Sequence, residues 1–110
     1  MVWWKMIFYE TAIFTSQITK LIDDESYGEL QSMLIADPES GDLIQRSQGL
    51  RKIRWRLPGR GKSGGIRVIY YIVCGEEIFL LFAYPKNKQE NITDEQARVL
   101  RRLVDEHLKA

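Results

Sequence analysis

Positively charged side chains dominate the middle of this 110-residue sequence. Residues 43–75 hold eight Lys and Arg and no Asp or Glu, although the formal net charge of the whole chain is only +1. The first 42 residues carry the opposite balance, eight acids against two bases. An asymmetry of this kind indicates a polyanion or an acidic partner. Guanidinium groups offer planar, paired donors that match the oxygens of a phosphate.

One predicted strand presents several of these cations on a single face. Apolar and charged residues alternate strictly from Ile53 to Leu57, so Arg54 and Arg56 point to the face opposite Trp55. Trp55 shares its side with apolar neighbours and is therefore expected in the core rather than stacked on a base. Lys52 lies at the start of the same strand.

A second strand carries an arginine among apolar residues. Arg67 interrupts the β-branched and aromatic run 66–73, where a guanidinium loses hydration and needs a partner or a task. Lys86 and Lys88 follow the next strand, 78–84. We expect six cations from three adjacent strands to converge on one concave face as a phosphate site: Lys52, Arg54, Arg56, Arg67, Lys86 and Lys88.

The elements that position these residues are predicted in the order β-α-α-β-β-β-α. A capping residue at Thr11, acids at 23–25 and a Thr-x-x-Gln capping box at Thr93 mark three helix starts. The predicted ranges are strand 3–9, two helices between 11 and 37, a loop over 39–49, strands 50–57, 66–73 and 78–84, and helix 94–108. We expect one α+β domain over 1–110, with an antiparallel-dominated sheet packed by two N-terminal helices and a C-terminal helix.

Several classes of protein are excluded by composition. One Cys and one His cannot build a disulfide framework or a structural zinc site. No apolar run reaches the roughly 18–20 residues that cross a bilayer, and Lys5 interrupts the apolar N-terminal segment, so no signal peptide is expected. These features predict a cytoplasmic domain that needs no metal or cofactor.

The central stretch resembles a known family. Gly49-Leu-Arg-Lys-Ile-Arg54, the loop Gly59-Arg-Gly-Lys-Ser-Gly-Gly65 and Ile66-Arg-Val-Ile-Tyr-Tyr71 together resemble the RelE/ParE superfamily of bacterial toxins, most closely its HigB branch. The resemblance implies a RelE-like fold and a ribosome-dependent mRNA endonuclease that inhibits translation. It also implies a cognate antitoxin of the HigA or RelB kind as a partner, together with mRNA and ribosomal RNA.

The family's working residues can be carried over position by position. They fall on Lys52, Arg54 and Arg56 in one strand, on Arg67 in the next, and on Lys86 and Lys88 after the last, with Tyr84 a weaker match. The histidines and aspartate of the better-known HigB site are missing, because His107 is the only histidine. The identity of the acid and the base is therefore open.

The chemistry of metal-free RNA cleavage assigns roles to these residues. The 2′-OH of RNA attacks the adjacent phosphate in line and leaves a cyclic phosphate and a 5′-OH, so an enzyme must orient the chain and stabilise added negative charge. We expect Arg54 and Arg67 to do the latter. A lysine crowded by cations has a lowered pKa and can exchange protons, which makes Lys52 and Lys86 candidates. Arg60 and Lys62 are expected to hold ribosomal RNA.

Two other functions stay open at this point. ParE-like relatives share the fold but act on DNA gyrase without cutting RNA. A basic surface alone specifies only binding, so a non-catalytic RNA-binding module is the third reading. Arg67, inside a strand, favours the nuclease, since a binding module needs only exposed cations.

Overall fold

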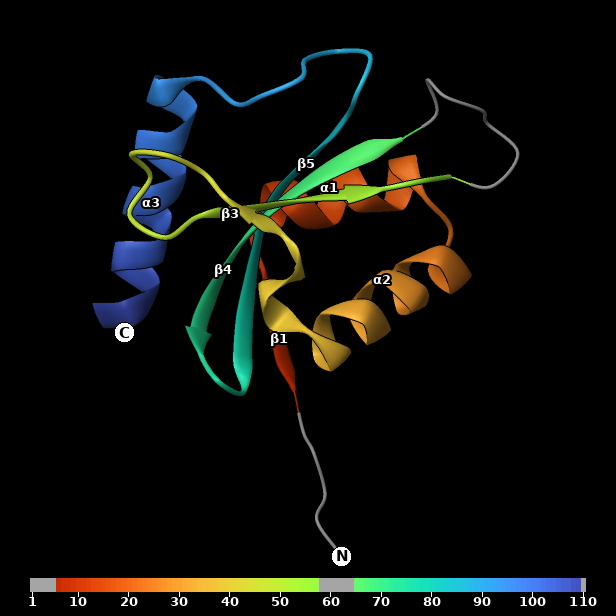
Figure 1. Cartoon of the computed structure of the whole chain (residues 1–110), viewed down its shortest axis with the longest axis horizontal. Coiled ribbons are helices and arrows are strands. Elements are labelled where there is room, and N and C mark those ends of the chain that lie inside the picture. The colour runs from red at the N-terminus through yellow and green to blue at the C-terminus, as the bar shows by residue number, and fades with distance from the viewer. Residues whose placement is uncertain (1–5, 58–64, 110) are drawn as a thin grey trace, which may run out of the picture.

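The computed structural model describes residues 6–57 and 65–109 and has a mixed α+β architecture (Figure 1). Three helices surround a central sheet. The elements in chain order are β1 (Ile7–Glu10), α1 (Ala12–Leu21), α2 (Asp24–Ala36), the 3-10 turn η1 (Pro38–Ser40), β2 (Asp42–Leu43), β3 (Arg51–Trp55), β4 (Ile66–Cys74), β5 (Glu77–Pro85) and α3 (Asp94–Lys109).

The sheet has five strands in the order β1-β5-β4-β3-β2. β1 runs parallel to β5, and every other pair is antiparallel. The long β4–β5 hairpin lies at the centre, as its near-continuous apolar sequence predicts for strands covered on both faces. The predicted α+β class and the antiparallel-dominated sheet are confirmed.

Local signals fix the starts of the first two helices. The Thr11 hydroxyl accepts a hydrogen bond from the Phe14 amide at 3.0 Å, and the Asp23 carboxylate accepts one from the Ser26 amide at 2.8 Å. Each cap satisfies an amide that has no partner inside its helix. Pro38 follows the end of α2, which confirms the predicted boundary near Asp37.

Two cores lie on opposite faces of the sheet. α1 and α2 cover one face, where Ile53, Val68 and Leu80 are buried against Phe14 and Leu30. On the other face, α3 packs over a second cluster that includes Leu50, Ile69, Phe79, Leu81, Tyr84, Leu100 and Val104. Trp55 packs against the first core, as predicted. Ile53 and Trp55 of β3 thus point toward α1 and α2, and Lys52 and Arg54 point the other way.

The segment 39–49, predicted to be a loop, contains η1 and the short strand β2 instead. Tyr70 supplies the reason: its buried hydroxyl donates to the Pro38 carbonyl at 2.6 Å and accepts from the Gly41 amide at 2.9 Å. These bonds pin the chain against β3, so β2 pairs Asp42 with Lys52.

The N-terminal strand is shifted by one residue toward the C-terminus relative to the prediction, over the residues that can be compared. It begins at Ile7, and the predicted strand positions 3–5 lie outside the described residues, as does most of the predicted glycine loop. No helix in the described part of the chain is long and apolar enough to cross a membrane.

Candidate active site

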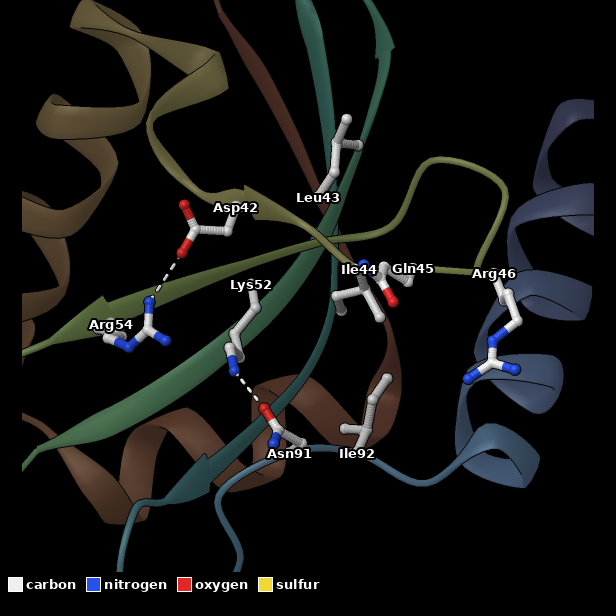
Figure 2. Close-up of a pocket in the computed structure, with 9 residues that line it drawn as sticks. All are labelled: Asp42, Leu43, Ile44, Gln45, Arg46, Lys52, Arg54, Asn91 and Ile92. Atoms are coloured by element: carbon white, nitrogen blue, oxygen red, sulfur yellow. Dashed lines mark hydrogen bonds and ion pairs between the residues drawn. The ribbon is translucent and has the colours of Figure 1, made fainter.

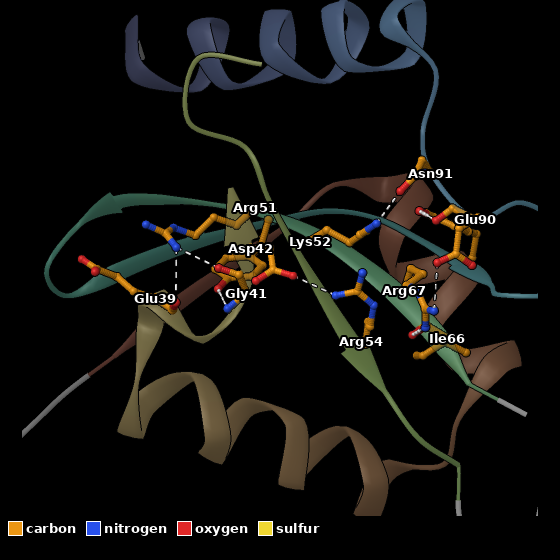
Figure 3. A network of polar contacts seen from close by, with 12 residues as sticks. Glu39, Gly41, Asp42, Arg51, Lys52, Arg54, Ile66, Arg67, Glu90 and Asn91 are labelled. Carbon is orange, nitrogen blue, oxygen red and sulfur yellow. Dashed lines mark hydrogen bonds and ion pairs between the residues drawn. The ribbon is translucent and has the colours of Figure 1, made fainter. Parts of the chain in front are cut away.

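The sheet register places the key cations in one row. Arg54 on β3 is the direct cross-strand partner of Arg67 on β4, and Arg67 is the partner of Tyr84 on β5. Lys52, two positions before Arg54, shares its face because side chains alternate along a strand. Figure 3 shows the three cations on the same side of the sheet, below α3. The predicted convergence is therefore present for Lys52, Arg54 and Arg67, which we call the cationic row.

Arg67 is buried with incomplete hydrogen bonding. Only 5% of the residue is exposed. Its Nη2 atom lies 3.4 Å from the Glu90 Oε1 atom, and its Nη1 atom lies 3.4 Å from the Ile66 carbonyl oxygen, and both distances are longer than in an ordinary N–H···O hydrogen bond. Its Nε atom is buried and has no hydrogen-bond partner among residues 6–57 and 65–109. An unsatisfied buried donor is costly, so this guanidinium has unused capacity to bind an anion.

Lys52 is also withdrawn from solvent, with 8% of the residue exposed. Its ammonium donates to the Asn91 side-chain oxygen at 2.5 Å. Burial lowers the pKa of Lys52 below its usual value, and the neighbouring charge of Arg54 lowers it further. The Lys52 amine is therefore easier to deprotonate than an ordinary lysine.

Arg54 is the solvent-facing member of the row. Its Nη1 atom donates to Asp42 at 2.8 Å, and both side chains are more than half exposed. Such a pair is screened by water and holds its geometry only weakly. Arg54 can exchange Asp42 for another anion at small cost.

Two carboxylates accompany these cations, and the sequence analysis missed both. Asp42 arrives through β2, and Glu90 comes from the segment between β5 and α3. Arg67 holds the pKa of Glu90 below its usual range through a hydrogen bond and its positive charge. The acid-free block 43–75 therefore does not fold into an acid-free surface. The partners come from outside it, with no local signal in their own sequence.

Tyr84 on β5 is hydrogen-bonded to the segment that carries Glu90 and Asn91. The residue is 4% exposed, and its hydroxyl donates to the Glu90 carbonyl at 3.2 Å. Burial raises the pKa of Tyr84, so it remains a protonated donor. The structure thus places Tyr84 where it positions the segment holding Glu90 and Asn91, rather than on the outer surface where a direct contact with RNA was expected.

A hollow of about 440 Å³ opens beside Lys52 and Arg54 (Figure 2). β2 and the following loop form one wall, and Asn91 and Ile92 form the other. Arg46 lines its far end, next to α3. Its lining is mixed: the cations Arg46, Lys52 and Arg54 lie beside the acid Asp42 and the apolar residues Leu43, Ile44 and Ile92.

The other predicted residues lie beyond the ends of β3 and β5 or outside the described residues. Arg56 is exposed just beyond β3. Lys86 is exposed after β5, its amide donates to Gly65, and its charge contributes to the lowered pKa of Glu90. Lys88 is exposed in the adjoining turn. None of the three makes an ion pair with a described residue at 4 Å or closer. Arg60 and Lys62 lie outside the described residues.

Within ranges 6–57 and 65–109, no three His, Cys, Asp or Glu side chains gather as metal ligands. The groups that the structure places at the site are two guanidinium groups, a lysine of lowered pKa and an ionised carboxylate. Together they can bind a phosphate, stabilise added negative charge on it and move a proton.

Comparisons with known proteins agree with this geometry. The sequence model of the family described as the RelE toxin of the RelE/RelB toxin–antitoxin system matches residues 41–110. The structure of a double mutant of the E. coli toxin RelE in the free state superposes with a TM-score of 0.55. That match has 13% sequence identity and covers 78% of this chain and 88% of the other, so it shows a shared fold.

Proposed function

The chain belongs to the RelE toxin family of toxin–antitoxin systems, and we propose that it is a ribosome-dependent mRNA endonuclease. It cuts mRNA in the cytoplasm, inhibits translation, and is neutralised by a cognate antitoxin. One observation carries the proposal: the β3–β4–β5 register aligns Arg54, Arg67 and Tyr84 across three strands, with Lys52 beside them.

The state of Arg67 favours catalysis over simple binding. A protein that only holds RNA needs exposed cations, since phosphate contacts form at the surface. Arg67 is instead buried, and no described residue accepts a hydrogen bond from its Nε atom. Donors that are fixed in advance and withdrawn from water are the kind that stabilise charge developing in a transition state.

The proposed reaction is transfer of the phosphate to the RNA's own 2′-oxygen. The 2′-O–P bond forms as the P–O5′ bond breaks, which leaves a 2′,3′-cyclic phosphate and a free 5′-OH. Arg67 and Arg54 bind the non-bridging oxygens of the phosphate and stabilise the extra charge of the pentacoordinate transition state. The nucleophile is the 2′-OH and not water. Because DNA lacks this hydroxyl, RNA is the substrate.

Two proton transfers accompany the bond changes. The neutral amine of Lys52 takes the proton of the 2′-OH, a role that its lowered pKa supports. Lys86, exposed near Glu90, gives a proton to the departing 5′-oxygen. Glu90 occupies Arg67 in the free protein and must yield this guanidinium to the phosphate. The ribosome supplies the remaining order by bending the mRNA into the in-line geometry.

The remaining residues hold RNA or accommodate the inhibitor. Arg56 and Lys88 contact the mRNA backbone, and Arg60 and Lys62 hold ribosomal RNA. Tyr84 keeps the Glu90–Asn91 segment in place. An antitoxin of the HigA or RelB kind neutralises the protein by covering the cationic row with acidic side chains or by adding a strand to an edge of the sheet.

Controlled expression of the wild type and of Arg67→Ala tests the proposal. Protein synthesis, mRNA ends and DNA supercoiling are followed together. We expect codon-phased cuts in mRNA that disappear in Arg67→Ala, with unchanged supercoiling. Intact mRNA with altered supercoiling would show a gyrase inhibitor instead, and harmless expression would show a binding module.

A further inference from the structure

A second group of arginines lies on α3, apart from the cationic row of Lys52, Arg54 and Arg67. Arg98, Arg101 and Arg102 are spaced i, i+3 and i+4, so they share one face of the helix. Together with Arg46 they line a separate hollow of about 260 Å³ between α3 and the loop 44–50. The only acid in its lining is Asp105, which is paired with Arg101 at 3.1 Å.

Arg101 joins the helix to the loop. Its Nε atom donates to the Gln48 side chain at 3.2 Å, and its guanidinium lies 4.8 Å from the centre of the Tyr71 ring. Its Nη1 atom is buried and has no hydrogen-bond partner in the described part of the chain. Arg46, Arg98 and Arg102 are exposed, and none of them makes an ion pair with a described residue at 4 Å or closer.

The loop that carries Arg46 is held by hydrogen bonds of its own. Ser47 is buried, its hydroxyl donates to the Ile44 carbonyl at 2.6 Å, and it accepts from the Leu50 amide at 3.1 Å. Arg46 itself has φ 59°, in the left-handed region that residues with a Cβ rarely adopt. The fold therefore holds Arg46 in an uncommon conformation that presents it beside α3 (Figure 2).

Arg46 connects the two hollows, because it lines both the one beside Lys52 and the one beside α3. We infer that Arg46, Arg98 and Arg102 form a phosphate track that continues from the cationic row and binds the RNA backbone flanking the cut. This inference rests on the proposed function, since it extends the same site along its substrate. The track fixes where the RNA lies and takes no part in the chemistry.

The composition of the track favours RNA over an acidic protein segment. Protein interfaces depend on apolar and aromatic anchors seated in pockets. The hollow beside α3 has only Ala97 as an apolar lining residue, and its other residues are polar or charged. Surfaces that bind nucleic acid are more polar and more positive, and arginine pairs well with phosphate.

Binding of a short fluorescein-labelled single-stranded RNA, measured by anisotropy over a range of salt concentrations, tests the track. Variants Arg98→Gln and Arg102→Gln are compared with Lys20→Gln, which removes one charge from an exposed position on α1. Each arginine variant should flatten the plot of log K against log salt by about 0.7 and weaken binding several-fold. Lys20→Gln should leave the slope unchanged.

A slope that stays at the wild-type value in both arginine variants would overturn the track. An equal loss in Lys20→Gln would also overturn it, because net charge would then explain the binding. If the arginine variants keep RNA binding but lose binding to polyglutamate, the surface serves an acidic protein and the inference is wrong.

A cleavage assay on ribosomes separates this inference from the proposed function. With mRNA-programmed 70S ribosomes, the arginine variants should raise KM several-fold and leave kcat unchanged. If the wild type cuts mRNA and the variants match it in KM and in salt slope, the track fails while the function stands. If the wild type does not cut but the slopes fall as expected, the function fails, and of the inference only RNA binding by these arginines stands.

Discussion

Arg54 and Arg67 face each other directly across β3 and β4. Like charges in this arrangement repel and destabilise a sheet. Each guanidinium is neutralised from elsewhere, Arg54 by Asp42 and Arg67 by Glu90. The pair is thus a concentration of positive charge that two of the protein's own carboxylates neutralise.

Replacing Arg67 should remove transition-state stabilisation without unfolding the protein. Arg67→Gln should lower kcat on programmed ribosomes roughly 100- to 1000-fold, the usual cost of losing one fixed donor. Arg67→Lys keeps the charge but loses the paired donor geometry, so it should also be impaired. Single-turnover cleavage measures both. An Arg67→Lys enzyme with wild-type kcat would show that charge alone suffices.

The lowered pKa of Lys52 predicts the pH dependence of cleavage. If the neutral amine is the base, the single-turnover rate should rise with pH and level off once the amine is deprotonated, with a slope of about one on a logarithmic plot. Glu90, whose pKa is lowered, is already ionised at neutral pH and cannot produce this rise. Lys52→Arg should be slow and should lose the rise. A wild-type cleavage rate that stays flat or falls as the pH rises would show that Lys52 is not the base.

Glu90 competes with RNA for Arg67, so its removal should have opposite effects on binding and stability. Glu90→Gln should bind RNA more tightly, because Arg67 is then available to phosphate. It should also lower the melting temperature at neutral pH, because Arg67 stays buried without a counterion. Since the folded state lowers the pKa of Glu90, the stability difference should vanish as the pH falls through that pKa.

A charge-matched variant controls for net charge in that experiment. Glu29→Gln changes the same charge at an exposed position on α2, which covers the opposite face of the sheet from α3. It should leave RNA affinity and melting temperature near the wild-type values. Equal tightening of RNA binding in the two variants would argue against a specific competition at Arg67.

Tyr70 should be required for the strand that brings Asp42 to the site. Tyr70→Phe leaves the Pro38 carbonyl and the Gly41 amide without their partner, which should cost about 1–3 kcal/mol in the free energy of unfolding. Tyr71→Phe removes the same atom from a neighbouring residue and should cost far less. Urea denaturation compares the two. Equal losses would show that the Tyr70 hydroxyl does not hold this segment.

Much of the fold could be predicted from local patterns in the sequence. Alternation in β3 separated Arg54 from Trp55, and the capping residues Thr11 and Asp23 marked two helix starts. The strand β2 could not be predicted, because two residues carry no periodicity and its position depends on Tyr70, 28 residues away from Asp42.

The residues of the site also fall into those that the sequence could predict and those that it could not. Lys52, Arg54 and Arg67 could be predicted because their strands are adjacent along the chain and pair as a meander. Glu90 and Asn91 could not, since they lie in a polar segment with no pattern. The Tyr84 hydroxyl fixes their place across a turn. Long-range contacts of this kind are decided by packing and leave no trace in local sequence.

The central claim is that the RNA's own 2′-oxygen is the nucleophile and that the cationic row stabilises its attack. Ribosomes programmed with an mRNA that carries a single 2′-deoxynucleotide at the mapped cut site test it most directly. The account predicts no cutting of that message, while the all-ribose message is cut to ends bearing a 2′,3′-cyclic phosphate and a 5′-OH. Cutting of the deoxy-substituted message at the same position and rate would contradict it.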